Sequence, residues 1–205
     1  MPHLTDFDGE SLERDREYEA TLFADRDFSG QDAGESHFLE CRLERCSIDG
    51  LTLHRARFVD SLLLDAYGAS LDASDSNWRG CHIRGGRLGA MTLAGATWTG
   101  MRVRGIKVGF LSLAGARLDE VVFEECEIGG FDARSAQLNS VAFLDSTLGE
   151  LNVAEATLSK VDLSGARLKA LVGVDSLRGA IVSREQLIDL APLLAAGLGL
   201  EVRPD

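Results

Sequence analysis

The residues best suited to chemistry in this sequence are cysteines and histidines, which hold transition metals and act as nucleophiles and bases. The four cysteines are separated by multiples of five, and no pair has the short spacing of a zinc knuckle. We therefore expect buried structural thiols, as in a reducing cytoplasm, and neither a metal nor a cofactor. The cysteines are Cys41, Cys46, Cys81 and Cys126.

The histidines and the remaining motifs point away from catalysis. His3, His37, His54 and His82 form no cluster in the sequence, which is typical of solvated surface residues. The sequence contains no G-x-S-x-G nucleophile elbow, no Walker loop and no paired-carboxylate motif. The sequence therefore predicts a protein that is not an enzyme.

Composition indicates one folded, acidic domain. Of the 205 residues, 45% are hydrophobic and 26% are charged, which is enough apolar material for a core. The net charge of −12 disfavours non-specific binding to DNA or to anionic lipid, and no apolar run approaches the roughly 20 residues of a membrane helix. The first ten residues lack a basic and then apolar leader, so a cytoplasmic location is expected.

A repeat of five residues dominates the chain. From Phe23 to Leu168 every fifth residue is Ala, Val, Ile, Leu, Phe or Trp, with Gly68 the one exception and no slip in register. Two residues earlier in each unit, from Cys41 to Ala166, the side chain is small or apolar. A period of five is neither helical nor a plain strand alternation. It predicts short extended segments joined by turns, stacked as a solenoid.

Side-chain size gives the number of sides of that solenoid. Every fourth central position is large, and the position two residues before it is Ala or Ser. This alternation predicts a four-sided coil of 20 residues, repeated about 7.5 times over residues 21–170. At roughly 4.8 Å per coil, the rod would be about 36 Å long. The large positions, which we expect to stack inside it, are Phe38, Phe58, Trp78, Trp98, Leu118, Leu138 and Leu158.

Units such as VDLSG, LSLAG and RDFSG resemble those of the pentapeptide-repeat family. The resemblance covers residues 21–170 and implies an all-β solenoid, the right-handed quadrilateral β-helix of that family.

Both ends of the repeat are predicted to be capped. Residues 1–20 form an acidic arm, and the first coil carries Arg26 and Gln31 where later coils have small or apolar residues, as a cap would. Residues 171–205 predict a helix with a capping box from Ser183 to Gln186, followed by a short strand. Its apolar stripe either covers the last coil alone or also forms a symmetric homodimer. The stripe comprises Leu187, Ile188, Leu190, Ala191 and Leu194.

Charge on the outward positions is banded along the chain. Residues 21–75 and 119–170 are acidic, and residues 76–118 hold seven bases and no acid. Either this basic belt is compensated by neighbouring coils, with Glu124 meeting Arg104 and Glu127 meeting Lys107, or it binds an anionic partner. The bases are Arg79, Arg84, Arg87, Arg102, Arg104, Lys107 and Arg117. The acids of the second band are Asp119, Glu120, Glu124, Glu125, Glu127, Asp132, Asp145, Glu150, Glu155 and Asp162.

Two functions follow from these features. The C-terminal segment resembles that of the quinolone-resistance branch, the Qnr-type and mycobacterial proteins. That resemblance implies a dimeric DNA mimic whose acidic surface occupies the DNA site of DNA gyrase or topoisomerase IV and protects the enzyme from quinolones. The alternative is a rigid protein-interaction scaffold with another partner. In both functions the protein binds another protein. Neither involves direct binding to nucleic acid or to a membrane, or catalysis.

Overall fold

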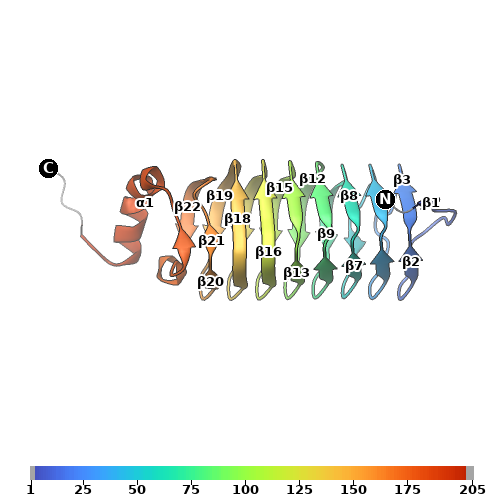
Figure 1. Ribbon diagram of the computed structural model, residues 1–205, viewed down its shortest axis with the longest axis horizontal. Helices are drawn as coiled ribbons and strands as arrows, with labels where there is room; N and C mark the ends of the chain where they lie inside the picture. Colours follow the sequence, from blue (N-terminus) through green and yellow to red (C-terminus); the bar gives the residue numbers. More distant parts are fainter. Residues whose placement is uncertain (1–2, 202–205) are drawn as a thin grey trace.

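The computed structural model describes residues 3–201, which form a straight rod of stacked coils closed by one helix (Figure 1). Every pairing among the described strands is parallel. Each of the central coils has four sides, here called faces 1 to 4 in chain order, whose central side chains point inward. Face 1 is centred on Trp78, face 2 on Ile83, face 3 on Leu88 and face 4 on Leu93.

Faces 1 and 2 are built from one 16-stranded sheet. Face 1 comprises β2 (Glu17–Glu19), β4 (His37–Leu39), β7 (Arg57–Val59), β10 (Asn77–Arg79), β13 (Thr97–Thr99), β20 (Thr157–Ser159) and the first halves of β16 (Arg117–Glu124) and β18 (Gln137–Leu144). Face 2 comprises the second halves of β16 and β18 with β1 (Thr5–Asp6), β3 (Thr21–Ala24), β5 (Arg42–Glu44), β8 (Leu62–Leu64), β11 (His82–Arg84), β14 (Arg102–Arg104), β21 (Val161–Asp162) and β23 (Ala180–Ile181).

A second, seven-stranded sheet forms face 3 and turns onto face 4. Its strands are β6 (Leu51–Thr52), β9 (Tyr67–Asp72), β12 (Arg87–Thr92), β15 (Lys107–Ser112), β17 (Glu127–Asp132), β19 (Ser146–Asn152) and β22 (Ala166–Val172). The chain then forms a 3-10 helix, η1 (Val174–Ser176), and the terminal helix α1 (Arg184–Gly197).

The register confirms the predicted coil of 20 residues. Trp78 pairs with Trp98, and Arg84 with Arg104. The same offset already holds where Glu17 pairs with His37, so the coil begins before the periodic segment does. It changes only at the two ends, where Thr5 pairs with Thr21 and Val161 with Ala180. The solenoid is therefore longer than its recognisable repeat.

The corners are made by residues of positive φ. At the corner from face 4 to face 1, Arg55 has φ 58° and the amide of Ala56 donates to the carbonyl of Leu53 at 3.0 Å, as in a type II turn. From β9 onward, the corner between faces 3 and 4 lacks positive φ, and the strand runs through it. This extended corner accommodates Phe110, a bulky residue in the position where Gly closes many other units.

The interior is a filled column, as predicted. Phe38, Phe58 and Trp78 stack almost face to face, with ring centroids 4.4 and 3.9 Å apart. The indole of Trp98 lies on the next coil but is tilted by 59° from that of Trp78. Beyond it the large side chains of face 1 are Leu118, Leu138 and Leu158, and the aromatic stack passes to Phe123 and Phe143 on face 2.

Two neighbouring tryptophans show that a side chain of the right size does not by itself satisfy the polar groups of the interior. The Nε1 of Trp78 donates to the hydroxyl of Ser76 at 2.8 Å. One coil later the equivalent residue is Ala96, and the buried Nε1 of Trp98 has no partner among residues 3–201. The size pattern of the sequence fits both residues, but only the serine supplies an acceptor.

Candidate interaction surfaces

The basic belt occupies three of the four faces in the middle of the rod. Arg79 lies on face 1, and Arg84, Arg102 and Arg104 lie on face 2. The remaining members are Arg87 and Lys107 on face 3, and Arg117 on face 1. Like charges stack in register, with Arg84 beside Arg104 and Arg87 beside Lys107. Such pairs weaken a sheet unless another charge compensates them.

Only part of this compensation is present. The guanidinium of Arg104 donates to both carboxylate oxygens of Glu125, at 2.9 and 3.2 Å, and lies 3.8 Å from Glu124. The ammonium of Lys107 donates to Glu127 at 2.8 Å. The hydrogen bond to Glu125 raises the pKa of Arg104, and the hydrogen bond from Lys107 lowers the pKa of Glu127. The predicted neighbours therefore meet, with the corner residue Glu125 as the main partner of Arg104.

Five cations of the belt have no ion pair within residues 3–201. They are Arg79, Arg84, Arg87, Arg102 and Arg117. The belt is thus a net cationic surface in a protein that is acidic overall.

The ten acids of the second band surround the rod rather than lining one face. By face, they are Asp119 and Glu120 on face 1; Glu124, Glu125, Asp145 and Asp162 on face 2; Glu127 and Glu150 on face 3; and Asp132 and Glu155 on face 4. Most are held by neighbours. Asp119 accepts from the amide of Asn139, and Glu155 accepts from the hydroxyl of Ser135 at 3.1 Å.

Several aspartates owe their place to turn chemistry. On face 4, Asp32 accepts from the backbone amide of Gly34 at 2.9 Å, and Asp72 accepts from that of Ser74. Asp162 makes the same contact with Ser164 on face 2. Asp132, whose side chain is only 6% exposed, accepts from the backbone and guanidinium of Arg134. An aspartate two residues before an amide is a common way to fix a turn.

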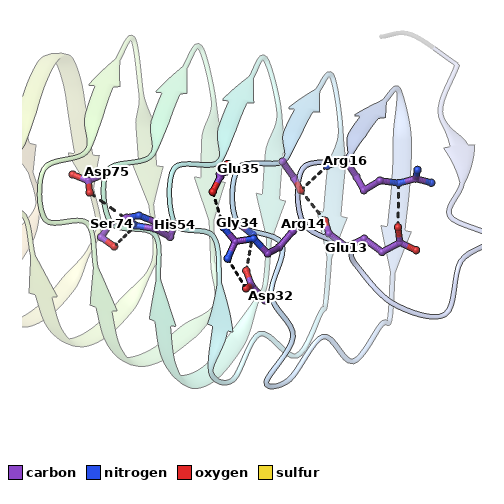
Figure 2. Close-up of polar contacts among 10 residues, drawn as sticks. Glu13, Arg14, Arg16, Asp32, Gly34, Glu35, His54, Ser74 and Asp75 are labelled. Atoms are coloured by element: carbon purple, nitrogen blue, oxygen red, sulfur yellow. Dashed lines mark hydrogen bonds and ion pairs between the residues drawn. The ribbon is translucent and has the colours of Figure 1, made fainter.

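Face 4 also binds the N-terminal segment. The sequence did not predict where this segment would bind. Figure 2 shows Arg14 reaching across from that segment to Asp32, at 3.1 Å, and to Glu35, at 2.6 Å. One coil further on, the Nδ1 of His54 lies 3.0 Å from the hydroxyl of Ser74. Part of the acidity of the first band is therefore neutralised within the chain.

The cysteines are buried thiols in the structure, as expected. Burial raises the pKa of Cys41 and Cys81 to about 11, and also raises that of Cys46 and Cys126. Within residues 3–201, no group of His, Cys, Asp and Glu could hold a metal ion.

These inward positions also have a hydrogen-bonding role that their size did not reveal. The amide of Cys41 donates to the hydroxyl of Ser61 at 3.0 Å, and that of Cys126 donates to Ser146 at 3.1 Å. A serine or cysteine here thus satisfies a backbone amide of the preceding coil.

In helix α1, part of the predicted apolar stripe is buried and part is exposed to solvent. Leu190 is buried and Leu194 half-buried, whereas Ala191 is exposed, Leu187 is 52% exposed and Ile188 is 70% exposed. Ser183 and Gln186 form the predicted capping box. No helix within residues 3–201 has both the length and the hydropathy needed to cross a bilayer.

The five-residue units and their four-sided coils together define a parallel, four-sided β-solenoid. A scan of protein-family models and a search of curated proteins found no match for the chain. Among solved structures, full-length QnrB1, a plasmid-mediated fluoroquinolone resistance protein, is 21% identical, with a TM-score of 0.36, 91% of this chain covered and 92% of that one. HetL of the cyanobacterium Nostoc sp. strain PCC 7120, involved in heterocyst differentiation regulation, is 16% identical, with a TM-score of 0.34 and coverage of 82% and 90%.

Proposed function

We propose that this protein is a non-catalytic rod that binds a partner protein through its charged outer faces. One observation supports this most directly: the interior is filled by side chains, so almost all chemical variety lies on the outside. A rigid solenoid binds with little loss of conformational freedom, which favours affinity. Charged faces steer association and determine which partners fit.

The finer proposal is a DNA mimic directed at DNA gyrase or topoisomerase IV. The second acidic band adjoins the C-terminal module, whose helix exposes Leu187 and Ile188. We propose that two chains join through these helices, which would place the second acidic band of each chain at the centre of a longer rod. Carboxylates on all four faces would then present charge around the rod, as phosphates do around a duplex.

The magnitude of the charge limits this mimicry. Duplex DNA carries one charge per roughly 1.7 Å, or about 21 charges over about 36 Å. Residues 21–170 contain 21 acids and 16 bases, a difference of −5. Several of the acids are also paired, as with Lys107 and Glu127. The broader proposal of a protein-binding rod does not depend on this density.

An assay of gyrase activity tests the finer proposal. We expect added protein to inhibit supercoiling and to reduce fluoroquinolone-induced DNA cleavage by gyrase and topoisomerase IV. The double variant Glu120→Lys and Glu150→Lys should weaken both effects, while Glu10→Lys, far from the second acidic band, serves as the control. No change at a tens-fold molar excess of protein would exclude gyrase as the partner.

A further inference from the structure

A shallow groove of about 860 Å³ runs along face 3, parallel to the axis of the rod. One wall is a column of side chains in register on successive coils, from Tyr67 to Thr147. The wall side chains are Tyr67, Arg87, Lys107, Glu127 and Thr147. Beside them the outward positions of four successive coils carry no side chain, which leaves the floor open.

Packing alone explains the glycines of the floor. A Cβ on Gly89 would clash with the carbonyl oxygen of Ala69, and each following glycine is confined in the same way by the coil before it. The floor glycines are Gly89, Gly109, Gly129 and Gly149. Any preference of the groove for a ligand therefore comes from the charged groups beside the floor and not from the glycines.

The charges of the groove favour an anionic occupant. Lys107 and Glu127 neutralise one another at 2.8 Å. The other two charged groups lining the groove, Arg87 and Lys169, are both cationic and form no ion pair within residues 3–201. Arg87 lies in register with Lys107, whose charge is compensated by Glu127.

The position of these two cations sets the spacing of the groups they would bind. Lys169 is the first side chain to follow the four glycines along the floor column, four coils beyond Arg87. At roughly 4.8 Å per coil this is about 19 Å, the length of about six residues of extended chain at roughly 3.3 Å each. An exposed aromatic ring lies at one end of the wall, since Tyr67 is 52% exposed.

We propose that this groove binds an extended acidic peptide segment with two carboxylates about six residues apart, one on Arg87 and the other on Lys169. This rests on, and makes specific, the proposed protein-binding function. A protein segment fits better than a nucleic acid, because the acidic segments 21–75 and 119–170 flank the belt and would repel a long polyanion.

Fluorescence anisotropy with defined probes tests the proposal. The probe is a fluorescein-labelled ten-residue peptide of serine and alanine with two glutamates six positions apart. Comparison probes have glutamates three positions apart, lysines in place of glutamates, or a single-stranded DNA decamer. We expect the first probe to bind best and its affinity to fall as salt rises.

Charge reversal then locates the site. Arg87→Glu and Lys169→Glu should each weaken binding about tenfold or more, and Arg79→Glu on face 1 should change it less than about twofold. All three residues are exposed, so the substitutions should leave the fold intact. Circular dichroism checks this. Equal weakening by Arg79→Glu, equal binding of the lysine peptide or the DNA, or no binding at millimolar peptide would overturn the proposal.

The same variants separate this inference from the gyrase proposal. Arg87→Glu should leave the inhibition of supercoiling unchanged, because that effect is assigned to the acidic band. Failure of the peptide to bind, with gyrase still inhibited, would refute the groove alone. Peptide binding without any effect on gyrase would retain the groove and refute the mimic.

Discussion

The two ends of the rod are closed in different ways. At the N-terminal end, the chain continues the coil and buries its own apolar residues, so that the outer surface is polar. The ring of Tyr18 stacks on Phe38 at 5.0 Å, and Phe7 packs on Phe23 at 4.7 Å. Arg26 and Gln31, polar exceptions in the repeat, bind this segment: Arg26 donates to the carbonyl of Phe7, and Gln31 accepts from the amide of Leu12.

At the C-terminal end, helix α1 lies beyond the last coil (Figure 1). Several apolar side chains of this end stay exposed. In this C-terminal segment Leu190 is buried, but Ile181, Leu187 and Ile188 are each more than half exposed. Among residues 3–201, the side chain that joins the helix to the solenoid by hydrogen bonds is Gln186, which donates to the carbonyls of Leu163 and Ala166.

This difference shows that covering the end of a solenoid does not require an apolar outer surface. Each coil contacts only its neighbours, so each end needs its own solution. The N-terminal solution buries its own apolar side chains, such as Phe7 and Leu12, while β1 and β2 remain edge strands of the sheet. The C-terminal solution leaves an apolar patch, which supports the proposal that this end associates with a second copy.

The largest expected effect comes from the N-terminal cap. Phe7→Ala should lower the free energy of unfolding by about 3 kcal/mol, because the ring is 9% exposed and packs against the rings of Tyr18, Phe23 and Phe28. Urea denaturation monitored by tryptophan fluorescence measures this. The exposed Glu10→Ala should change stability by less than about 0.5 kcal/mol. Equal effects of the two substitutions would show that the segment is not a cap.

The second effect concerns the attachment of the helix. Gln186→Glu should cost about 2 kcal/mol, although glutamate is common in capping boxes, because its carboxylate would face the carbonyls of Leu163 and Ala166. The carboxylate is disfavoured in the folded state, so its pKa rises on folding and the loss should shrink as pH falls toward about 4. Gln186→Ala has no such pH dependence and is the control. A pH-independent deficit in the Glu variant would contradict this account.

A smaller effect is expected at Arg26. Its guanidinium donates to the carbonyl of Phe7 and lies 5.7 Å from the centre of that ring. Arg26→Met should lower the free energy of unfolding by about 1 kcal/mol. Arg16→Met, which removes only an exposed ion pair with Glu13, should have less effect in the same denaturation experiment. A larger loss at Arg16 would argue against the role assigned to Arg26.

The smallest effect on folding is expected on the exposed surface of α1. Ile188→Asp should change unfolding of the single chain by less than about 0.5 kcal/mol, because the side chain is 70% exposed. In sedimentation at micromolar concentration, it should convert the proposed dimer to a monomer. Arg184→Asp, exposed on the same helix, should leave the dimer intact. A wild-type monomer, or a dimeric Ile188→Asp, would refute this interface.

The fold could be predicted because its repeat is local in sequence. The inward register, the coil of 20 residues and the neighbours Arg84 and Arg104 all follow from a period that never slips. The capping box of Ser183 and Gln186 was also predictable, since it depends on residues three apart. In contrast, the function of Gln31 in the cap depends on a segment that lies outside the repeat.

The candidate surfaces could be predicted only in part. The sequence predicted that the charged residues occupy outward positions. It did not predict which hydrogen-bond or ion-pair partner each carboxylate would have. Asp32 and Asp162, for example, accept from nearby backbone amides, and Arg104 takes the corner residue Glu125 as its main partner. These outcomes depend on side-chain conformation at each corner, which a five-residue period does not encode.

The sequence by itself determined the inside of this protein, because buried side chains must alternate in size at a fixed spacing to fill a narrow interior. The tertiary structure alone decided which outward side chains form pairs and which apolar side chains of the C-terminal helix stay exposed. It showed that the strands of face 3 run through a corner and leave a groove, and that Leu187 and Ile188 remain exposed while Leu190 is buried. Solvated side chains are not constrained by packing, so their partners depend on neighbours that lie a full coil away.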